Sequence, residues 1–244
     1  MRTLAPSTRL FLGAAFYLGV TASLGPLWSE DLWWHLRTGQ LIVEQHALPH
    51  ADPYSYTRPG APWVAHEWGY EVLVYAAYAA GGWLGIIYLT ALLVGLTALL
   101  AAGLALRWRA GLFPAVLGAA LLAFALGPWV NARPQMLDPL YLLVLLHLLT
   151  SYREGRSRAL WWMPPLFLVW ANTHGTFVMG WALVGLWGVW QVAAREDQGA
   201  DGGARVPALQ PEQRGGRKRR GDGRISRADA RYSPLRRGER TGGT

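Results

Sequence analysis

The sequence contains no cysteine, a single lysine and few charged residues of any kind. Without cysteine, neither a disulfide framework nor a thiolate metal site can form. Charged residues make up 16% of the chain, whereas a soluble globular domain has roughly a quarter. Hydrophobic residues account for 52%, so the deficit in charge indicates a chain built largely for an apolar solvent.

The chain also lacks the short motifs that mark several enzyme classes. It has no glycine-rich phosphate loop, no H-E-x-x-H zinc motif and no serine nucleophile elbow. Its pI near 10.2 comes mainly from residues 196–244, which hold 12 of the 23 basic residues and 7 of the 15 acidic ones. Because that charge belongs to the tail, it does not indicate a nucleic-acid partner, and we expect none.

Long apolar runs dominate the first 195 residues. A membrane-spanning helix needs about 20 mostly apolar residues, and this criterion predicts an all-α, polytopic transmembrane helical bundle of about six spans. The large loop of residues 29–82 separates the first two spans. Within it, Trp68–Ala80 is too short to span and is expected to form an interfacial helix, ended by Gly81–Gly82. The predicted spans are residues 10–28, 83–106, 112–130, 136–152, 160–171 and 176–193.

Arginines between the predicted spans set the orientation of this transmembrane domain, residues 1–195. Lys and Arg are enriched in cytoplasmic loops. If the N-terminus is cytoplasmic, every cytoplasmic segment carries arginine: Arg2, Arg9, Arg107, Arg109, Arg153, Arg156, Arg158 and Arg195. Counting Trp68–Ala80 as a full span would turn most of these arginines outward. We therefore expect the N-terminus and the tail to be cytoplasmic and the loop of residues 29–82 to be external.

The tail, residues 196–244, has almost no large apolar side chains and no periodicity, and this composition predicts disorder. One interpretation is a basic arm that lies at the anionic inner leaflet of the membrane. The other is that the tail has no evolved structure, as after a frameshift or a truncation. The abrupt change in composition after Arg195 favours the second interpretation.

Polar residues gather at the external ends of the predicted spans. Glu30 and Asp31 follow the first span, where adjacent carboxylates can act as a general base or hold a divalent cation, or simply begin a solvated loop. His35 follows closely. Arg133 lies with Asn131 between the third and fourth spans. A guanidinium can bind a phosphate with two hydrogen bonds, although an arginine at this level can also merely extend to the interface.

Two further groups belong to this external set. His66 and Glu67 end the large loop, and Asn172 and His174 form a polar turn between the fifth and sixth spans. As a helix, residues 160–171 reach only about 18 Å, against a hydrocarbon core of about 30 Å. The turn should therefore lie below the external surface, where polar backbone needs protein or water around it. It is a candidate binding site, unless Asn172 and His174 only cap helices.

Four strings of the sequence are typical of a bacterial group of multi-spanning proteins: DLWWHLRTGQLI, PHADPYSYTRPGAPWVAHEWGYE, ARPQ and WANTHGTF. Together with the acidic pair directly after the first span, they make residues 9–193 resemble the GT-C superfamily of membrane glycosyltransferases. The resemblance implies an enzyme of the bacterial inner membrane that takes a sugar from a polyprenyl-phosphate donor in the lipid. Members usually have more than six spans, so it also implies that this chain is truncated.

These residues permit a hypothesis for the mechanism. Asp31 accepts the proton of the acceptor hydroxyl, and Glu30 assists it or holds a divalent metal ion. Arg133 balances the charge of the leaving phosphate. The residues predicted to bind substrate are Arg133, His174, Asn172, His66, Glu67 and His35. The alternatives are a non-catalytic transporter or assembly factor and an inactive fragment; the absence of an internal repeat argues against a transporter.

Overall fold

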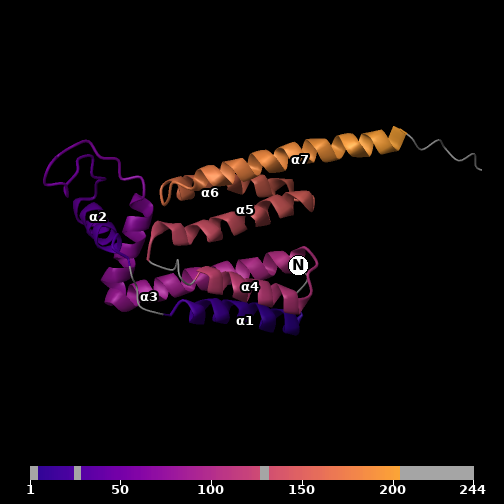
Figure 1. Ribbon diagram of the computed structural model, residues 1–244, viewed down its shortest axis with the longest axis horizontal. Coiled ribbons are helices and arrows are strands. Elements are labelled where there is room, and N and C mark those ends of the chain that lie inside the picture. Colours follow the sequence, from indigo (N-terminus) through magenta and orange to yellow (C-terminus); the bar gives the residue numbers. More distant parts are fainter. Residues whose placement is uncertain (1–4, 25–28, 127–131, 204–244) are drawn as a thin grey trace, which may run out of the picture. The chain divides into compact units, whose positions relative to one another are not determined.

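The computed structural model describes residues 5–24, 29–126 and 132–203, and the side chains of these residues up to residue 194. Within these ranges the protein is all-helical, as predicted, and has no β-strand; Ala51 and Pro62 form an isolated bridge. Figure 1 shows the helices α1 (Pro6–Ala22), α2 (Leu32–Gln45), α3 (Trp68–Arg107), α4 (Leu112–Leu126), α5 (Asp138–Arg153), α6 (Met163–Ala171) and α7 (Phe177–Gly203), with the short 3-10 helices η2 (Pro134–Leu137) and η3 (Ser157–Trp162).

Helix α3 is broken at Gly81 and Gly82. Gly82 has φ +59° and ψ −142°, a combination that glycine adopts readily and other residues do not. The break separates residues 68–80 from residues 83–107, which is the division that the sequence predicts. As a result, the first part of α3 can pack against α2 while the second part runs with α1 and α4.

Within the part of the chain that the structure describes, two helices are long and apolar enough to cross a membrane, judged by length and composition: the 40-residue α3 and the stretch Phe177–Ala194 of α7. The helices α1, α4, α5 and α6 have 17, 15, 16 and 9 residues. Helix α7 continues to Gly203, so the tail predicted to begin at residue 196 starts within a helix. The rest of the tail lies outside the described residues, as do residues 25–28 and residues 127–131, where two predicted spans end.

The chain up to Arg195 forms one compact unit, in which α1, α3 and α4 meet through small residues. Ala98 of α3 and Ala119 of α4 are almost fully buried in an alanine-rich cluster. A Cβ on Gly19 of α1 would lie 2.9 Å from the Cα of Gly95 on α3. Small residues at such contacts allow helix backbones to approach closely, which is how apolar helices associate when lipid supplies no hydrophobic drive.

A second cluster joins α3, α5 and α6 around larger side chains. Trp170 of α6 is fully buried and lies 5.3 Å from Tyr141 of α5, measured between ring centroids. Helix α2 is fixed to the first part of α3 by a tight contact, because a Cβ on Gly39 would lie 2.0 Å from the carbonyl oxygen of Glu71. This contact fixes the position of Asp31, which directly precedes α2.

Candidate functional site

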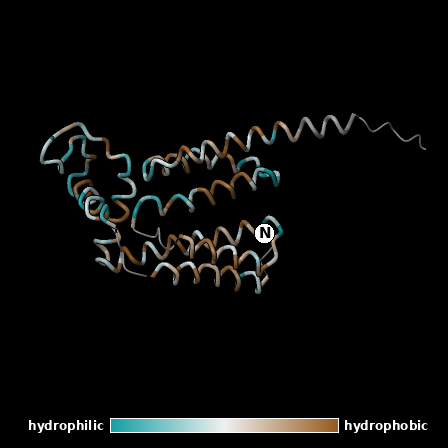
Figure 2. The backbone as a smooth tube through the Cα atoms, viewed as in Figure 1, coloured by the Kyte–Doolittle hydropathy of each residue, from teal (hydrophilic) through white to brown (hydrophobic). Residues whose placement is uncertain are grey.

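The compact unit has two ends of opposite charge. The C-terminus of α1, the N-termini of α2, α3 and α5, and the α6–α7 turn lie at one end, called here the acidic end; the α3–α4 and α5–α6 connections lie at the other, the arginine end (Figure 1). Hydrophobic residues line the helices between them (Figure 2). The segments of the acidic end, together with the rest of α2 and the loop of residues 46–67 that lies beside it, contain Glu30, Asp31, Glu44, Asp52, Glu67, Glu71 and Asp138 with Arg37, Arg58 and Arg133. The arginine end carries Arg107, Arg109, Arg153, Arg156 and Arg158 with Glu154.

Asp31 and Arg133 form an ion pair at the acidic end. Nη2 of Arg133 lies 3.0 Å from Oδ2 of Asp31, and Nε of Arg133 donates a hydrogen bond to the Ser29 hydroxyl at 3.2 Å. The side chains of Arg133 and Asp31 are 37% and 45% exposed. A ligand in solution or in the headgroup region can therefore reach both partners. Glu30, next to Asp31, is also exposed.

Asp31 lacks the capping hydrogen bond that an aspartate usually makes at the start of a helix. It is the N-cap residue of α2 and makes no side-chain capping hydrogen bond. Such a cap commonly contributes about 1 kcal/mol to helix stability. The carboxylate instead faces Arg133, so the local stabilisation of α2 is given up for a contact with a distant segment of the chain.

His174 forms a more buried group of polar contacts. Its Nδ1 lies 2.8 Å from Oδ2 and 3.0 Å from Oδ1 of Asp138, the first residue of α5. The Thr176 hydroxyl and Nε1 of Trp170 donate to the same carboxylate, the latter at 3.1 Å. Nε2 of His174 lies 3.8 Å from Oε1 of Glu67. Because a carboxylate only accepts hydrogen bonds, Nδ1 must carry the proton.

The surroundings of His174 favour the protonated imidazole. Burial lowers its pKa, but the hydrogen bond to Asp138 and the charges of Asp138 and Glu67 outweigh burial and raise the pKa above the ordinary 6.5. The side chains of His174 and Asp138 are 13% and 17% exposed. This pair is therefore less accessible to a ligand than the pair formed by Asp31 and Arg133.

Asn172 uses its polar groups to join elements of the fold. Nε1 of Trp68 donates to Oδ1 of Asn172 at 2.7 Å, and Nδ2 of Asn172 donates to the Leu168 carbonyl at 2.7 Å. The N–H of Gly69 donates to the Asn172 carbonyl at 2.8 Å. The predicted substrate-binding amide thus connects the α6–α7 turn to the start of α3, and both of its polar atoms are occupied.

The other two predicted histidines lie in different environments. His66 is exposed, and its Nε2 lies 3.8 Å from Oε1 of Glu67. His35 is 2% exposed and lies between α2 and α3, with Nδ1 3.6 Å from Oε1 of Glu71. A side chain so deeply buried cannot meet a substrate arriving from outside, so its predicted role as a substrate-binding residue does not agree with this position.

Three polar residues were missed by the sequence prediction. Asp138 is the most connected of them, and it is the only carboxylate between Glu71 and Glu154. An isolated acidic residue in so apolar a stretch is itself a functional signal. Ser29 and Thr176 carry no comparable signal, because a lone hydroxyl is common in loops.

The described residues do not fit the divalent ion considered for Glu30 and Asp31. Within these ranges no group of three or more Asp, Glu or His side chains is arranged to hold a metal, and Asp31 is already paired with Arg133. No step of the mechanism is therefore assigned to a metal. In comparisons with known proteins, no protein-family model, curated protein or solved structure matches the chain.

Proposed function

We propose that this chain is a six-span glycosyltransferase of a bacterial inner membrane, which moves a sugar from a polyprenyl-phosphate donor to a hydroxyl acceptor at the external face. The spans are α1, the second part of α3, α4, α5, α6 with η3, and α7. The observation that carries the proposal is the exposed ion pair of Asp31 and Arg133. It joins a potential base to a phosphate-binding group on the acidic end.

Exposed apolar side chains support the membrane assignment. Monomeric soluble proteins rarely expose large contiguous apolar surfaces, whereas lipid tails accept them. Only 6% of the apolar stretch of α7 is buried. Exposed large side chains of α1, α4 and α7 include Leu10, Tyr17, Phe113, Leu121, Phe124, Trp181, Leu186 and Val189.

The orientation follows from the charges of the two ends. Arginine is concentrated on the cytoplasmic side of membrane proteins. The arginine end therefore faces the cytoplasm, and the acidic end, with Asp31, Arg133 and His174, faces outward. Nucleotide sugars are confined to the cytoplasm, so an external transferase needs a lipid-linked donor.

The proposed reaction begins when the donor phosphate reaches Arg133. The guanidinium exchanges the Asp31 carboxylate for the phosphate, with which it can form two charge-assisted hydrogen bonds. Asp31 is thereby released to act as a base. The acceptor oxygen then attacks the anomeric carbon, and the bond between that carbon and the phosphate oxygen breaks. The phosphate leaves with the electron pair, held by Arg133, and Asp31 takes the hydroxyl proton.

In this proposal, the other residues of the acidic end hold in place the helix ends and turns around the site. The charge of protonated His174 is offset by the carboxylates of Asp138 and Glu67, so this group holds the α6–α7 turn against the start of α5. Asn172 holds the α6–α7 turn against the start of α3. Glu67, which contacts His174 and His66, lies on the acceptor side with His66.

The test is a transfer assay on membranes that contain the full chain and a radiolabelled polyprenyl-phosphate sugar. Asp31→Asn should abolish transfer, because the amide cannot accept the proton. Arg133→Gln should raise the donor KM, because the phosphate loses its cation. Glu44→Gln, an exposed change on the same helix as Asp31, is the matched control and should transfer at the wild-type rate. Undiminished transfer by Asp31→Asn would contradict the assigned base, and no transfer by any form would favour a non-catalytic protein.

A further inference from the structure

The arginine end contains a pocket that the proposed transfer reaction does not use. It has a volume of about 550 Å³ and lies between the end of α5 and η3. Its lining includes Leu148, Ser151, Ser157, Arg158 and Trp162. A second hollow of about 500 Å³ shares Arg158 and Trp162 with this pocket and is also lined by Trp161 and Pro165. The two hollows therefore adjoin at Arg158 and Trp162.

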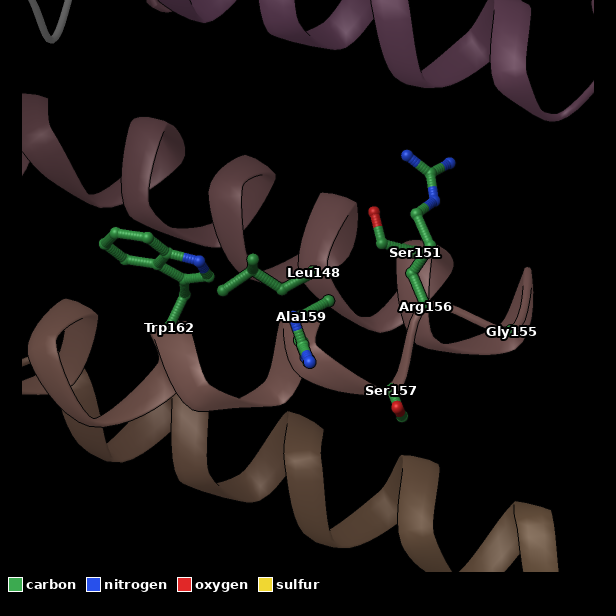
Figure 3. A pocket seen from close by; sticks show the side chains of 8 residues that line it. Leu148, Ser151, Gly155, Arg156, Ser157, Ala159 and Trp162 are labelled. Atoms are coloured by element: carbon green, nitrogen blue, oxygen red, sulfur yellow. The ribbon is translucent and has the colours of Figure 1, made fainter.

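The pocket has a polar side and an apolar side. Figure 3 shows the side chains of Leu148 and Trp162 together on one side of the pocket, and those of Ser151 and Arg156 on the other. The adjoining hollow continues the apolar side with Trp161 and Pro165. A molecule that fits must therefore be amphipathic, with a polar group and an apolar chain joined in one ligand.

The residues around the two hollows carry uncompensated positive charge. The carboxylate of Glu154 pairs with both Arg107, at 3.0 Å, and Arg156, so one negative charge serves two positive ones. Arg158 is exposed and forms no ion pair within the described part of the chain. The Ser151 hydroxyl accepts a hydrogen bond from Arg107, which leaves its own hydrogen free to donate. These groups suit an anion.

Tryptophans place the pocket at the level of the lipid headgroups. Trp161 and Trp162 are 79% and 67% exposed. Trp108, also exposed, donates a hydrogen bond to Thr150. Tryptophan is enriched at the boundary between the hydrocarbon core and water, and basic pockets between helices on the cytoplasmic side of membrane proteins bind anionic headgroups.

We propose that this pocket binds one anionic phospholipid of the inner leaflet. The phosphodiester lies against the Arg158 guanidinium, and one acyl chain runs along Trp162 and Pro165, which line the same hollow as Arg158. The inference rests on the membrane orientation given under Proposed function but not on sugar transfer. An inactive chain would still bind the lipid.

The experiment uses the full chain reconstituted in phosphatidylcholine bilayers. A trace of spin-labelled phosphatidylglycerol, or of spin-labelled phosphatidylcholine, reports the immobilised lipid fraction and hence a relative association constant. The wild-type chain should favour phosphatidylglycerol. Arg158→Gln should reduce that preference about tenfold, the order expected for the loss of one charge-assisted hydrogen bond to the phosphate. Arg109→Gln removes the same charge from the same end, outside the pocket, and should change it less than twofold.

Two results would overturn the proposal. Equal immobilisation of both lipids by the wild-type chain would show that the end has no preference for an anion. An equal loss from Arg109→Gln and Arg158→Gln would show that the preference comes from the general charge of the arginine end rather than from the pocket. Transfer activity is measured on the same preparations, so loss of transfer with retained lipid preference separates failure of the proposed function from failure of this one.

Discussion

Replacement of Asp138 by asparagine tests the structural role of the His174 group. The carboxylate accepts hydrogen bonds from His174, Thr176 and Trp170. Asparagine keeps one oxygen but replaces the other with a donor and removes the charge. A hydrogen bond to a charged group contributes about 1.5–3 kcal/mol. His174 can lose its proton when its partner is gone, which lowers the cost of the change. We therefore expect the free energy of unfolding to fall by about 2 kcal/mol.

The loss should depend on pH in a defined direction. The hydrogen bond to Asp138 and the two nearby carboxylates raise the pKa of His174 in the folded state against the effect of burial. A raised pKa means that folding favours the protonated imidazole. The resulting stabilisation is fully present below the unfolded pKa of about 6.5 and disappears as the pH rises through the folded value. Asp138→Asn should therefore cost most below pH 6.5 and least at high pH.

The assay is thermal unfolding of the purified chain in a neutral detergent at several pH values. For a domain of this size, about 2 kcal/mol corresponds to a fall in Tm of roughly 4–8 °C. Glu44→Gln is the control for removal of a carboxylate, and its Tm should follow the wild-type value at every pH. An Asp138→Asn chain whose deficit is constant with pH, or grows as the pH rises, would refute the assignment of a charged pair.

Two further predictions concern helix packing and orientation. Gly39→Ala should lower the free energy of unfolding by about 3 kcal/mol, because its Cβ would lie 2.0 Å from the Glu71 backbone and a methyl group cannot rotate away from that clash. Gly118→Ala, whose Cβ would have no heavy atom within 4 Å, should lower Tm little or not at all. Equal Tm values for the two variants would contradict the contact. The chain has no native cysteine, so single cysteines can report the orientation. Tyr56→Cys, at an exposed position, should react with an impermeant maleimide in spheroplasts with intact inner membranes, whereas Ser157→Cys should react only after lysis. The reverse pattern would contradict the orientation.

Much of the helical organisation could be predicted because it depends on local signals. Apolar runs predict helices, and the glycine pair at Gly81 and Gly82 predicts the break in α3 because only glycine accepts that backbone. The partners of the polar residues could not be predicted in the same way. Asp31 and Arg133 are far apart in the sequence, and their meeting depends on how α1, α2 and α5 pack.

The burial of His35 shows where a readable signal was overlooked. Leu32, His35, Leu36, Gly39 and Ile42 are all buried, and their spacing is that of one face of a helix. In a loop, His35 would be one polar residue among several. Considered as a helix, the segment places it on the same face as two leucines and an isoleucine, which predicts packing against a neighbour.

The two ion pairs of the acidic end differ in what they can do, and exposure decides the difference. The pair of His174 and Asp138 is mostly buried, so opening it exposes neither group to water and costs about the 2 kcal/mol expected for Asp138→Asn. The pair of Asp31 and Arg133 is more than a third exposed on both sides, and exposed pairs are worth at most about 1 kcal/mol. A phosphate that forms two hydrogen bonds with Arg133 can therefore displace Asp31 at little cost, while His174 and Asp138 keep the helix starts in place around it.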